Sequence, residues 1–328
     1  MCSWIIFFSL TVSLVKTKNL QQIFVTEPGS DSVREGESVV LECEVKNKAG
    51  VLQWTKDDFG LGTSRDLPGY SRLSMVGGSN DTWNLRIENV TLEDDGRYQC
   101  QVGATETSQP IRSEYAVLTV LTPAQPPVLS VSSVWRLEED RLGMVQCISR
   151  GGHPAPIIRW TLNGQLVTTG VQENVTQMKN SKKLVTISTL KFPVTINLSG
   201  STLECEAENE AGSDTVQTQI QVEFKPKVSI QPDKREYFEG ERLTVECSVA
   251  ALPEQVSYQW FVGGQEIHEA EGAVEMKISV TRDLHLKTVS CLARNSVGQS
   301  SADYKLDVKC KSKKYLLIFN LVTLPLKI

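Results

Sequence analysis

The chain of 328 residues has few of the side chains that most catalytic and metal sites need. It contains three histidines, which lie far apart at His153, His268 and His285, and none of its eight cysteines forms a Cys-x-x-Cys pair. The Gly-x-Ser-x-Gly and His-Glu-x-x-His motifs are absent as well. These absences argue against a histidine-based active site, a zinc ribbon and thioredoxin-like redox chemistry. We therefore expect no enzyme, no metal or other cofactor, and no small-molecule substrate.

An excess of basic residues is also missing. Lys and Arg total 34 against 39 Asp and Glu, which gives a net charge of −5. A protein with this mild negative charge has no electrostatic reason to bind nucleic acid or an anionic membrane surface.

No apolar run reaches the roughly 20 residues that a membrane-spanning helix needs. The run Trp4–Val15 has 12 residues, the length of a signal-peptide core, and we expect residues 1–20 to be a signal peptide. The interrupted apolar run Tyr315–Leu326 follows a group of lysines. Residues 310–328 are therefore predicted to be a short basic and apolar tail. Membrane association is expected to be indirect, or to use this poor C-terminal segment.

Helical periodicity is missing too, and a period of two takes its place. Leu41, Cys43 and Val45 alternate with Glu42 and Glu44, and the residues around Cys247 follow the same pattern. Alternation of this kind is typical of strands with one buried face. The sequence predicts an all-β fold.

Cysteine and tryptophan recur about every hundred residues. The first cysteine of each repeat stands at 43, 147 and 247, and a tryptophan follows it after 11 to 13 residues. Regular long separations favour structural disulfides in an oxidising compartment; the alternative is six buried free thiols in a cytosolic protein. The predicted disulfides join Cys43 to Cys100, Cys147 to Cys205, and Cys247 to Cys291.

The order cysteine, tryptophan, cysteine on alternating strands is typical of an immunoglobulin sandwich. Tyr98 lies two residues before Cys100, at the position of the tyrosine corner. Proline-rich segments suggest the boundaries. We predict tandem immunoglobulin-like β-sandwiches, three domains in a row, at residues 21–121, 125–223 and 226–309, referred to below as the first, second and third repeats.

The acidic run Glu93-Asp94-Asp95 has two interpretations. It could bind calcium, or it could form the turn that precedes the strand of Cys100. Its short distance from that cysteine favours the turn.

Four glycosylation sequons add to the picture of an exported protein. With the signal-like start, they predict an extracellular glycoprotein, secreted or held at the cell surface. The acceptor residues are Asn80, Asn89, Asn174 and Asn197.

One sheet face of the first repeat stands out because its predicted outward positions carry no charge. Residues that alternate with Trp54 and Cys100 point away from the core. Depletion of charge together with Tyr and apolar residues marks the centre of a protein interface, and an amide such as that of Gln53 would demand a matched partner. The alternative is a face covered by its own neighbouring segment or by a glycan at Asn80. The candidate partner-binding residues are Val51, Gln53, Thr55, Gln99, Gln101, Tyr115 and Val117.

The first repeat resembles the irregular chiasm/roughest/Kirrel (Neph) family of immunoglobulin-superfamily cell adhesion proteins. The resemblance runs from Val51-Leu52-Gln53-Trp54-Thr55-Lys56-Asp57 through Leu61-Gly62 to Tyr98-Gln99-Cys100-Gln101 and Leu118-Thr119-Val120-Leu121. It implies a cell–cell adhesion or recognition protein, acting at synapses or other cell junctions, whose partner is a like or nephrin-like immunoglobulin protein. It also places Gln53 near the centre of the contact. Because the family's members have five domains and a membrane span, the alternative is a soluble decoy or ligand-binding receptor fragment without signalling of its own.

Overall fold

The computed structural model describes residues 21–309, and its regular structure is almost entirely β-strand. The predicted all-β class is confirmed. The predicted signal peptide, the predicted tail, Cys2 and Cys310 lie outside the described residues. Between residues 21 and 309, no helix has the length and apolar character needed to cross a membrane. The helical segments described are single 3₁₀ turns: η1 (Leu92–Asp94), η2 (Ile196–Leu198), η3 (His268–Ala270) and η4 (Arg282–Leu284).

The described residues divide into two compact units. One contains the residues up to Ser130 together with 145–190 and 204–217, and the other contains 131–144, 191–203 and the residues from 218 onward. The first repeat lies wholly in the first of these units and the third repeat wholly in the second, while the second repeat contributes residues to both.

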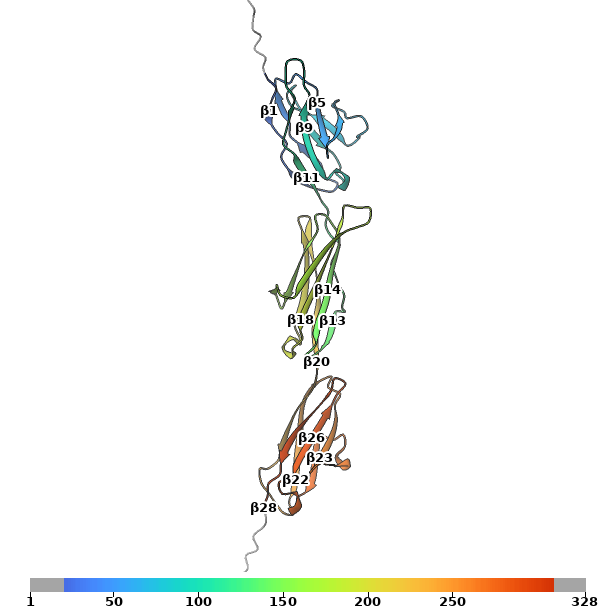
Figure 1. Ribbon diagram of the computed structural model, residues 1–328. Helices are drawn as coiled ribbons and strands as arrows, with labels where there is room; N and C mark the ends of the chain where they lie inside the picture. The colour runs from blue at the N-terminus through green and yellow to red at the C-terminus, as the bar shows by residue number, and fades with distance from the viewer. Residues whose placement is uncertain (1–20, 310–328) are drawn as a thin grey trace, which may run out of the picture. The chain divides into compact units, whose positions relative to one another are not determined.

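The first repeat is built from two main sheets (Figure 1). One has the strand order β2-β11-β9-β5-β6, with β10 beside β9, and the other has the order β3-β8-β7; β1 and β4 form a separate pair. The strands are β1 (Ile23–Thr26), β2 (Asp31–Arg34), β3 (Val39–Leu41), β4 (Glu44–Lys46), β5 (Leu52–Lys56), β6 (Phe59–Gly62), β7 (Leu73–Val76), β8 (Asn84–Ile87), β9 (Gly96–Val102), β10 (Ile111–Arg112) and β11 (Ala116–Leu121).

The second and third repeats repeat this two-sheet pattern. The second has sheets β12-β14-β18-β17 and β16-β15-β19-β20, and the third has β20-β22-β25 and β24-β23-β26-β27. In addition, β13 pairs with β20, and β21 pairs with β28. The strands are β12 (Val128–Leu129), β13 (Val134–Glu138), β14 (Leu142–Gly152), β15 (Ile157–Leu162), β16 (Gln165–Val167), β17 (Val171–Gln177), β18 (Leu184–Pro193), β19 (Thr202–Asn209), β20 (Gly212–Pro232), β21 (Tyr237–Phe238), β22 (Arg242–Leu252), β23 (Ser257–Val262), β24 (Gln265–Glu266), β25 (Glu275–Ser279), β26 (Thr288–Arg294), β27 (Gln299–Lys305) and β28 (Val308–Lys309).

Strand β20 runs through the segment that the sequence suggests as a boundary. Its residues Gln219–Glu223 pair with β13, and the stretch from Phe224 to Pro232 pairs with β22. Residues 224–227 are therefore strand rather than loop. The division into three domains at the expected boundaries remains a prediction.

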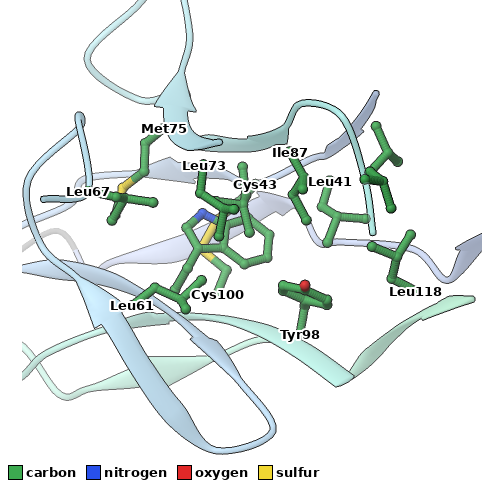
Figure 2. Packing of buried hydrophobic residues seen from close by; sticks show 14 of the residues in the cluster. Leu41, Cys43, Leu61, Leu67, Leu73, Met75, Ile87, Tyr98, Cys100 and Leu118 are labelled. Atoms are coloured by element: carbon green, nitrogen blue, oxygen red, sulfur yellow. A yellow bond between two sulfur atoms is a disulfide. The ribbon is translucent and has the colours of Figure 1, made fainter. Parts of the chain in front are cut away.

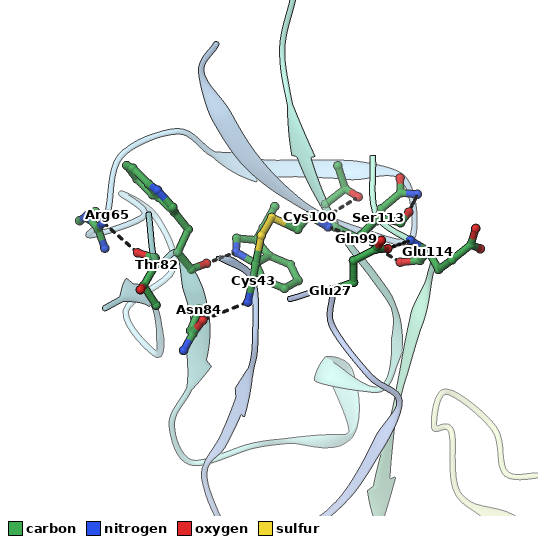
Figure 3. The surroundings of a disulfide bond; sticks show 12 residues. Glu27, Cys43, Arg65, Thr82, Asn84, Gln99, Cys100, Ser113 and Glu114 are labelled. Atoms are coloured by element: carbon green, nitrogen blue, oxygen red, sulfur yellow. Dashed lines mark hydrogen bonds between the residues drawn. A yellow bond between two sulfur atoms is a disulfide. The ribbon is translucent and has the colours of Figure 1, made fainter. Parts of the chain in front are cut away.

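Each repeat contains the disulfide that the spacing predicts. Bonds join Cys43 to Cys100, Cys147 to Cys205, and Cys247 to Cys291. Around the first bond, the backbone N–H of Cys43 donates to Asn84 Oδ1 at 3.0 Å and that of Cys100 donates to Ser113 Oγ at 3.0 Å (Figure 3). Closing a loop of this length removes conformations from the unfolded chain and so stabilises the folded one.

The core of the first repeat forms around Trp54. This side chain is fully buried, and its indole N–H donates to the carbonyl of Trp83 at 2.8 Å, which satisfies its polar atom. Figure 2 shows aliphatic side chains from both sheets, including Leu41 and Leu118, gathered with Tyr98 in the same cluster. The alternation read from the sequence thus corresponds to one continuous core between the two sheets.

The acidic run before β9 forms the predicted turn. The hydroxyl of Tyr98 donates to the carbonyl of Asp94 at 2.7 Å, which is the contact of a tyrosine corner. The buried carboxylate of Asp94 accepts two hydrogen bonds from Arg72, at 2.6 and 3.0 Å, and one from the backbone N–H of Thr91 at 2.8 Å. Burial raises the pKa of the Asp94 carboxyl, but the bonds from Arg72 and Thr91 outweigh it and hold that pKa below its usual value. The carboxylate is thus fully engaged by protein donors.

Asp94→Asn is expected to reduce the free energy of unfolding by about 2 kcal/mol at about pH 7, because charge-assisted hydrogen bonds to a buried carboxylate are lost. A lowered folded-state pKa stabilises the protein above the unfolded-state value of about 3.9, and this stabilisation is lost as the pH falls through the folded-state pKa. The difference between variant and wild type should therefore shrink below about pH 4. Calorimetric unfolding of the full chain across this pH range measures it. The exposed Asp66→Asn is the control, and a difference that does not change with pH would contradict the assignment.

Candidate binding face

The candidate face is the outer surface of the sheet that contains β5, β9 and β11. In the register of β5 and β9, Trp54 lies opposite Cys100, Gln53 opposite Gln101, and Thr55 opposite Gln99. Because Trp54 and Cys100 point into the core, the residues that alternate with them face outward. The register therefore brings four of the seven predicted residues together in two adjacent pairs.

The three other predicted residues lie at the margins of the face. Val51 directly precedes β5 and is 63% exposed. Tyr115 precedes β11, and Val117 lies on it in register with Arg97; both predicted side chains are exposed. They extend the surface around the central pairs.

Two of the predicted residues offer almost no surface to a partner. Thr55 is 5% exposed and Gln99 is 7% exposed. The Gln99 amide donates to the carbonyl of Ser113 at 2.6 Å and accepts from Gln101 Nε2 at 2.7 Å, while the Thr55 hydroxyl donates to the Gln99 carbonyl at 3.4 Å. Thr55 and Gln99 therefore stabilise the face through hydrogen bonds beneath its surface and are not available to contact a partner. Gln53 and Gln101, which are half-buried, form its accessible centre.

Gln53 differs from its neighbours because no described residue forms a hydrogen bond with its amide. Among residues 21–309, its side chain makes no hydrogen bond, and its amide lies directly over Gly60 of β6. A Cβ atom on residue 60 would lie 1.6 Å from Gln53 Nε2, so the absence of a side chain at Gly60 creates the space that the Gln53 side chain fills. An amide held on a surface with both its donor and its acceptor free is a group that a partner can satisfy.

The expectation of a face without any charge is wrong at its edge. Arg97 lies on β9 two residues from Gln99 and faces the same way, and Arg112 on β10 lies opposite Gln101. Sequence reasoning could have found Arg97 from the period of two in the same strand. It missed Arg112 because the short strand β10 has no clear sequence signal.

The charge of Arg97 is compensated locally. Its guanidinium lies over the ring of Tyr115, 4.8 Å from the ring centroid, and pairs with Asp58 at 3.4 Å. The Tyr115 hydroxyl donates to the same carboxylate at 2.6 Å, and this hydrogen bond raises the pKa of the phenol above its usual value. These three side chains form one ordered cluster at the edge of the face.

An exposed aromatic residue that the sequence did not indicate stands beside this cluster. Phe59 is 78% exposed and begins β6, directly after a two-residue turn formed by Asp57 and Asp58. Both aspartates have positive φ angles, 48° and 69°, as a type I′ hairpin turn requires. The backbone N–H of Arg97 donates to Asp57 and lowers the pKa of that carboxyl, which fixes the turn against β9. The turn thus presents Phe59 to solvent, on the side of β6 opposite to Gly60 and Gln53.

The equivalent sheets of the other repeats carry many more charges. In the second repeat, Arg159 on β15 forms ion pairs with Glu206 and Glu208 on β19. In the third, Asp303 and Lys305 lie on β27. The amide-centred surface of the first repeat is therefore not a general property of these sandwiches.

The sequons lie away from this face. Asn80 belongs to the loop between β7 and β8, which are strands of the opposite sheet, and Asn89 lies two residues after the end of β8. Asn174 lies in β17 and Asn197 in η2. All four asparagines are exposed. A glycan at Asn80 would begin on the sheet opposite the candidate face. Its position therefore does not favour the alternative that this glycan covers the face.

Comparison with protein-family models identifies immunoglobulin domains in each repeat. An immunoglobulin-domain model matches residues 22–103 and 225–295, and a model of the CD80-like C2-set immunoglobulin domain matches residues 127–215. Immunoglobulin proteins of this kind are a non-enzymatic class, as the sequence predicts. Within the described part of the chain, no group of three or more His, Cys, Asp or Glu residues is arranged to hold a metal ion.

Individual proteins match across the repeats. The irregular chiasm C-roughest protein of Drosophila melanogaster is 34% identical over 320 residues, which is 89% of this chain and 42% of that protein. Human kin of IRRE-like protein 1 is 30% identical over 302 residues, which is 91% of this chain and 39% of that protein. The crystal structure of Rst D1-D2 covers 61% of this chain and 99% of its own, with 38% identity and a TM-score of 0.55. The chain thus spans about two fifths of the length of these curated relatives.

Proposed function

The chain belongs to the irregular chiasm/roughest/Kirrel family of immunoglobulin-superfamily proteins, and from that premise we propose that it is an extracellular cell–cell recognition protein. Its partner is an immunoglobulin domain, either a second copy of this chain or a related protein. The contact uses the face formed by β5, β9 and β11 of the first repeat, with Gln53 at its centre. The protein acts where two cell surfaces meet.

The observation that carries this proposal is the free amide of Gln53 at the centre of a surface whose charged residues, Arg97, Arg112 and Asp58, lie at its edge. A buried amide without a partner would cost about 1–3 kcal/mol, so only a surface with a matching donor and acceptor can cover it well. An amide offers both a donor and an acceptor, and two glutamines related by a two-fold axis satisfy each other. The centre of the face therefore favours a partner that carries the same kind of group.

The surroundings of Gln53 fit an interface. Val51 and Val117 supply exposed apolar area beside the two central amides. The Arg97–Tyr115–Asp58 cluster supplies a charged margin with its geometry already fixed. An apolar and amide centre with charge confined to the rim is the usual composition of a specific protein contact.

The experiment uses two sets of beads coated with the secreted full chain, labelled in two colours, together with beads that carry related immunoglobulin ectodomains. Clustering of chain-coated beads with each other, or with beads that carry a relative, is the expected result. Beads coated with the chain after reduction and alkylation serve as the control, because they keep the sequence and lose the disulfides. Beads that remain dispersed in every combination would contradict the proposed function.

A further inference from the structure

The second repeat has an apolar sheet face that ends at a glycosylation sequon. In the sheet β12-β14-β18-β17, the residues that alternate with buried Cys147 and Ser188 point outward. Val128 is 55% exposed and lies opposite Ile148, which is half-buried. On β18, the outward Ile187 is half-buried as well.

Strand register places Asn174 at the end of this apolar row. The backbone N–H of Val194 donates to the carbonyl of Arg141 at 2.9 Å, and the Gln146 amide donates to the Thr189 hydroxyl at 3.2 Å. Both contacts fit one antiparallel register of β14 and β18, in which Ile148 lies across from Ile187. On the other side of β18, Ile187 lies opposite Asn174. The row therefore crosses all four strands and consists of Val128, Ile148, Ile187 and Asn174. The third residue of the sequon, Thr176, lies opposite Val185 on the same face.

The corresponding sheets of the other repeats carry ion pairs at their outward positions. Arg86 and Glu88 lie 3.7 Å apart in the first repeat, and Lys277 and Glu275 lie 3.0 Å apart in the third. In the second repeat, Arg150 and Lys191 are the two charged residues among the described outward positions of this sheet, and both are basic, so no ion pair joins them. A surface with so little charge is open to association with other apolar surfaces.

The same sheet also has a long free edge. Strand β17 is its last strand, and six of the seven residues Val171–Gln177 are exposed. Glu173 is the one charged residue among them. An exposed edge with unpaired N–H and C=O groups can pair with another chain, and proteins usually protect such edges.

We propose that Asn174 carries an N-linked glycan that covers this apolar row and the free edge of β17, and that this glycan keeps the second repeat from pairing with other chains. The amide nitrogen of Asn174 forms the bond to the first sugar of a lipid-pyrophosphate-linked oligosaccharide, the amide loses a proton, and the lipid pyrophosphate leaves. The Cβ atom of Asn174, from which the glycan extends, lies about 5 Å from that of Ile187, the spacing of directly opposite residues in a sheet.

The attached sugar is the occupant that the geometry favours. A bulky, solvated chain that starts within the row blocks the approach of another sheet, whereas a docked protein would have to displace it. The C–H groups of the proximal N-acetylglucosamine can lie on the Ile187 side chain while its hydroxyl groups stay in water. This assignment does not depend on the proposed function, which concerns the first repeat.

The test uses the full chain secreted from eukaryotic cells, with Gln53→Asp present throughout to silence the proposed contact of the first repeat. Two variants, Asn174→Gln and Thr176→Ala, remove the sequon by different changes. Asn197→Gln is the matched control, since it removes a sequon in a 3₁₀ turn rather than on a sheet face. Glycopeptide mass, light scattering after size exclusion, and the fluorescence of an apolar dye are measured for each.

We expect the Asn174 peptide to carry a glycan in the parent protein. Both sequon variants should form dimers and larger species and should bind several-fold more dye, while Asn197→Gln should match the parent. Adding Ile187→Thr to Asn174→Gln should restore the monomer, because it removes the apolar side chain that the glycan covers. If a sequon variant is not secreted, enzymatic deglycosylation of the folded parent should produce the same association.

An unmodified Asn174 peptide in the secreted protein would overturn the proposal, as would sequon variants that stay monomeric with dye binding equal to that of Asn197→Gln. A glycosylated parent that self-associates and becomes monomeric on Ile187→Thr would also overturn it, because the face would then bind a second copy.

Discussion

Trp54→Ala is expected to lower the free energy of unfolding of the first repeat by about 3–5 kcal/mol. The side chain is fully buried between the two sheets, and its removal leaves a large cavity beside the Cys43–Cys100 disulfide. It also leaves the carbonyl of Trp83 without the indole donor. Hydrogen exchange of the full chain reports the opening of this repeat separately from that of the others, because it is measured amide by amide. Amides of β5 and β9 should exchange roughly a hundredfold to several thousandfold faster, which is the change that 3–5 kcal/mol implies.

Trp83→Ala is the matched control for this prediction. Trp83 is half-buried, with Arg65 4.0 Å and Lys48 4.8 Å from its ring centroid. Its removal should cost about 1–2 kcal/mol, since part of its surface is already in water. Equal acceleration of exchange in the two variants would show that the repeat is not organised around Trp54.

The sequence predicted the parts of the fold that follow from strong local patterns. Cys43, Trp54 and Cys100 lie on strands whose alternation points each of them inward, so spacing and parity together give the sandwich and its disulfide. Tyr98 could be assigned because the tyrosine corner has a fixed distance from the second cysteine. The same parity predicts that Gln53 and Gln101 share one sheet face, whereas their direct pairing follows from the register of β5 and β9.

The remaining features of the face depend on contacts that parity does not specify. The buried Gln99 amide hydrogen-bonds to Gln101 on its own strand and to Ser113, which follows β10, and sequence parity gives no sign of the second contact. The space over Gly60 depends on how β6 passes β5, and the exposure of Phe59 depends on positive φ angles at two aspartates. The continuity of β20 through residues 224–227 depends on its pairing with β13 and β22.

Gln53→Asp is expected to abolish recognition, with binding weakened at least about a hundredfold. A carboxylate at the centre of the contact would be desolvated without a partner, and in a symmetric contact it would face a second carboxylate. The folded first repeat should tolerate the change, because Gln53 is half-buried and makes no hydrogen bond among the described residues. Its unfolding transition should therefore stay within about 0.5 kcal/mol of wild type.

The most direct measurement compares clustering of beads coated with wild type, Gln53→Asp and Ser74→Asp, each alone and mixed with beads that carry related immunoglobulin ectodomains. Ser74 is half-buried on β7, where it pairs with Arg86 of β8 in the sheet that lies opposite the candidate face. Ser74→Asp therefore adds the same charge to the same repeat away from that face. The account predicts that wild type and Ser74→Asp cluster and that Gln53→Asp does not, with all three proteins equally folded. Clustering of Gln53→Asp at the wild-type level would contradict the claim that this face binds the partner.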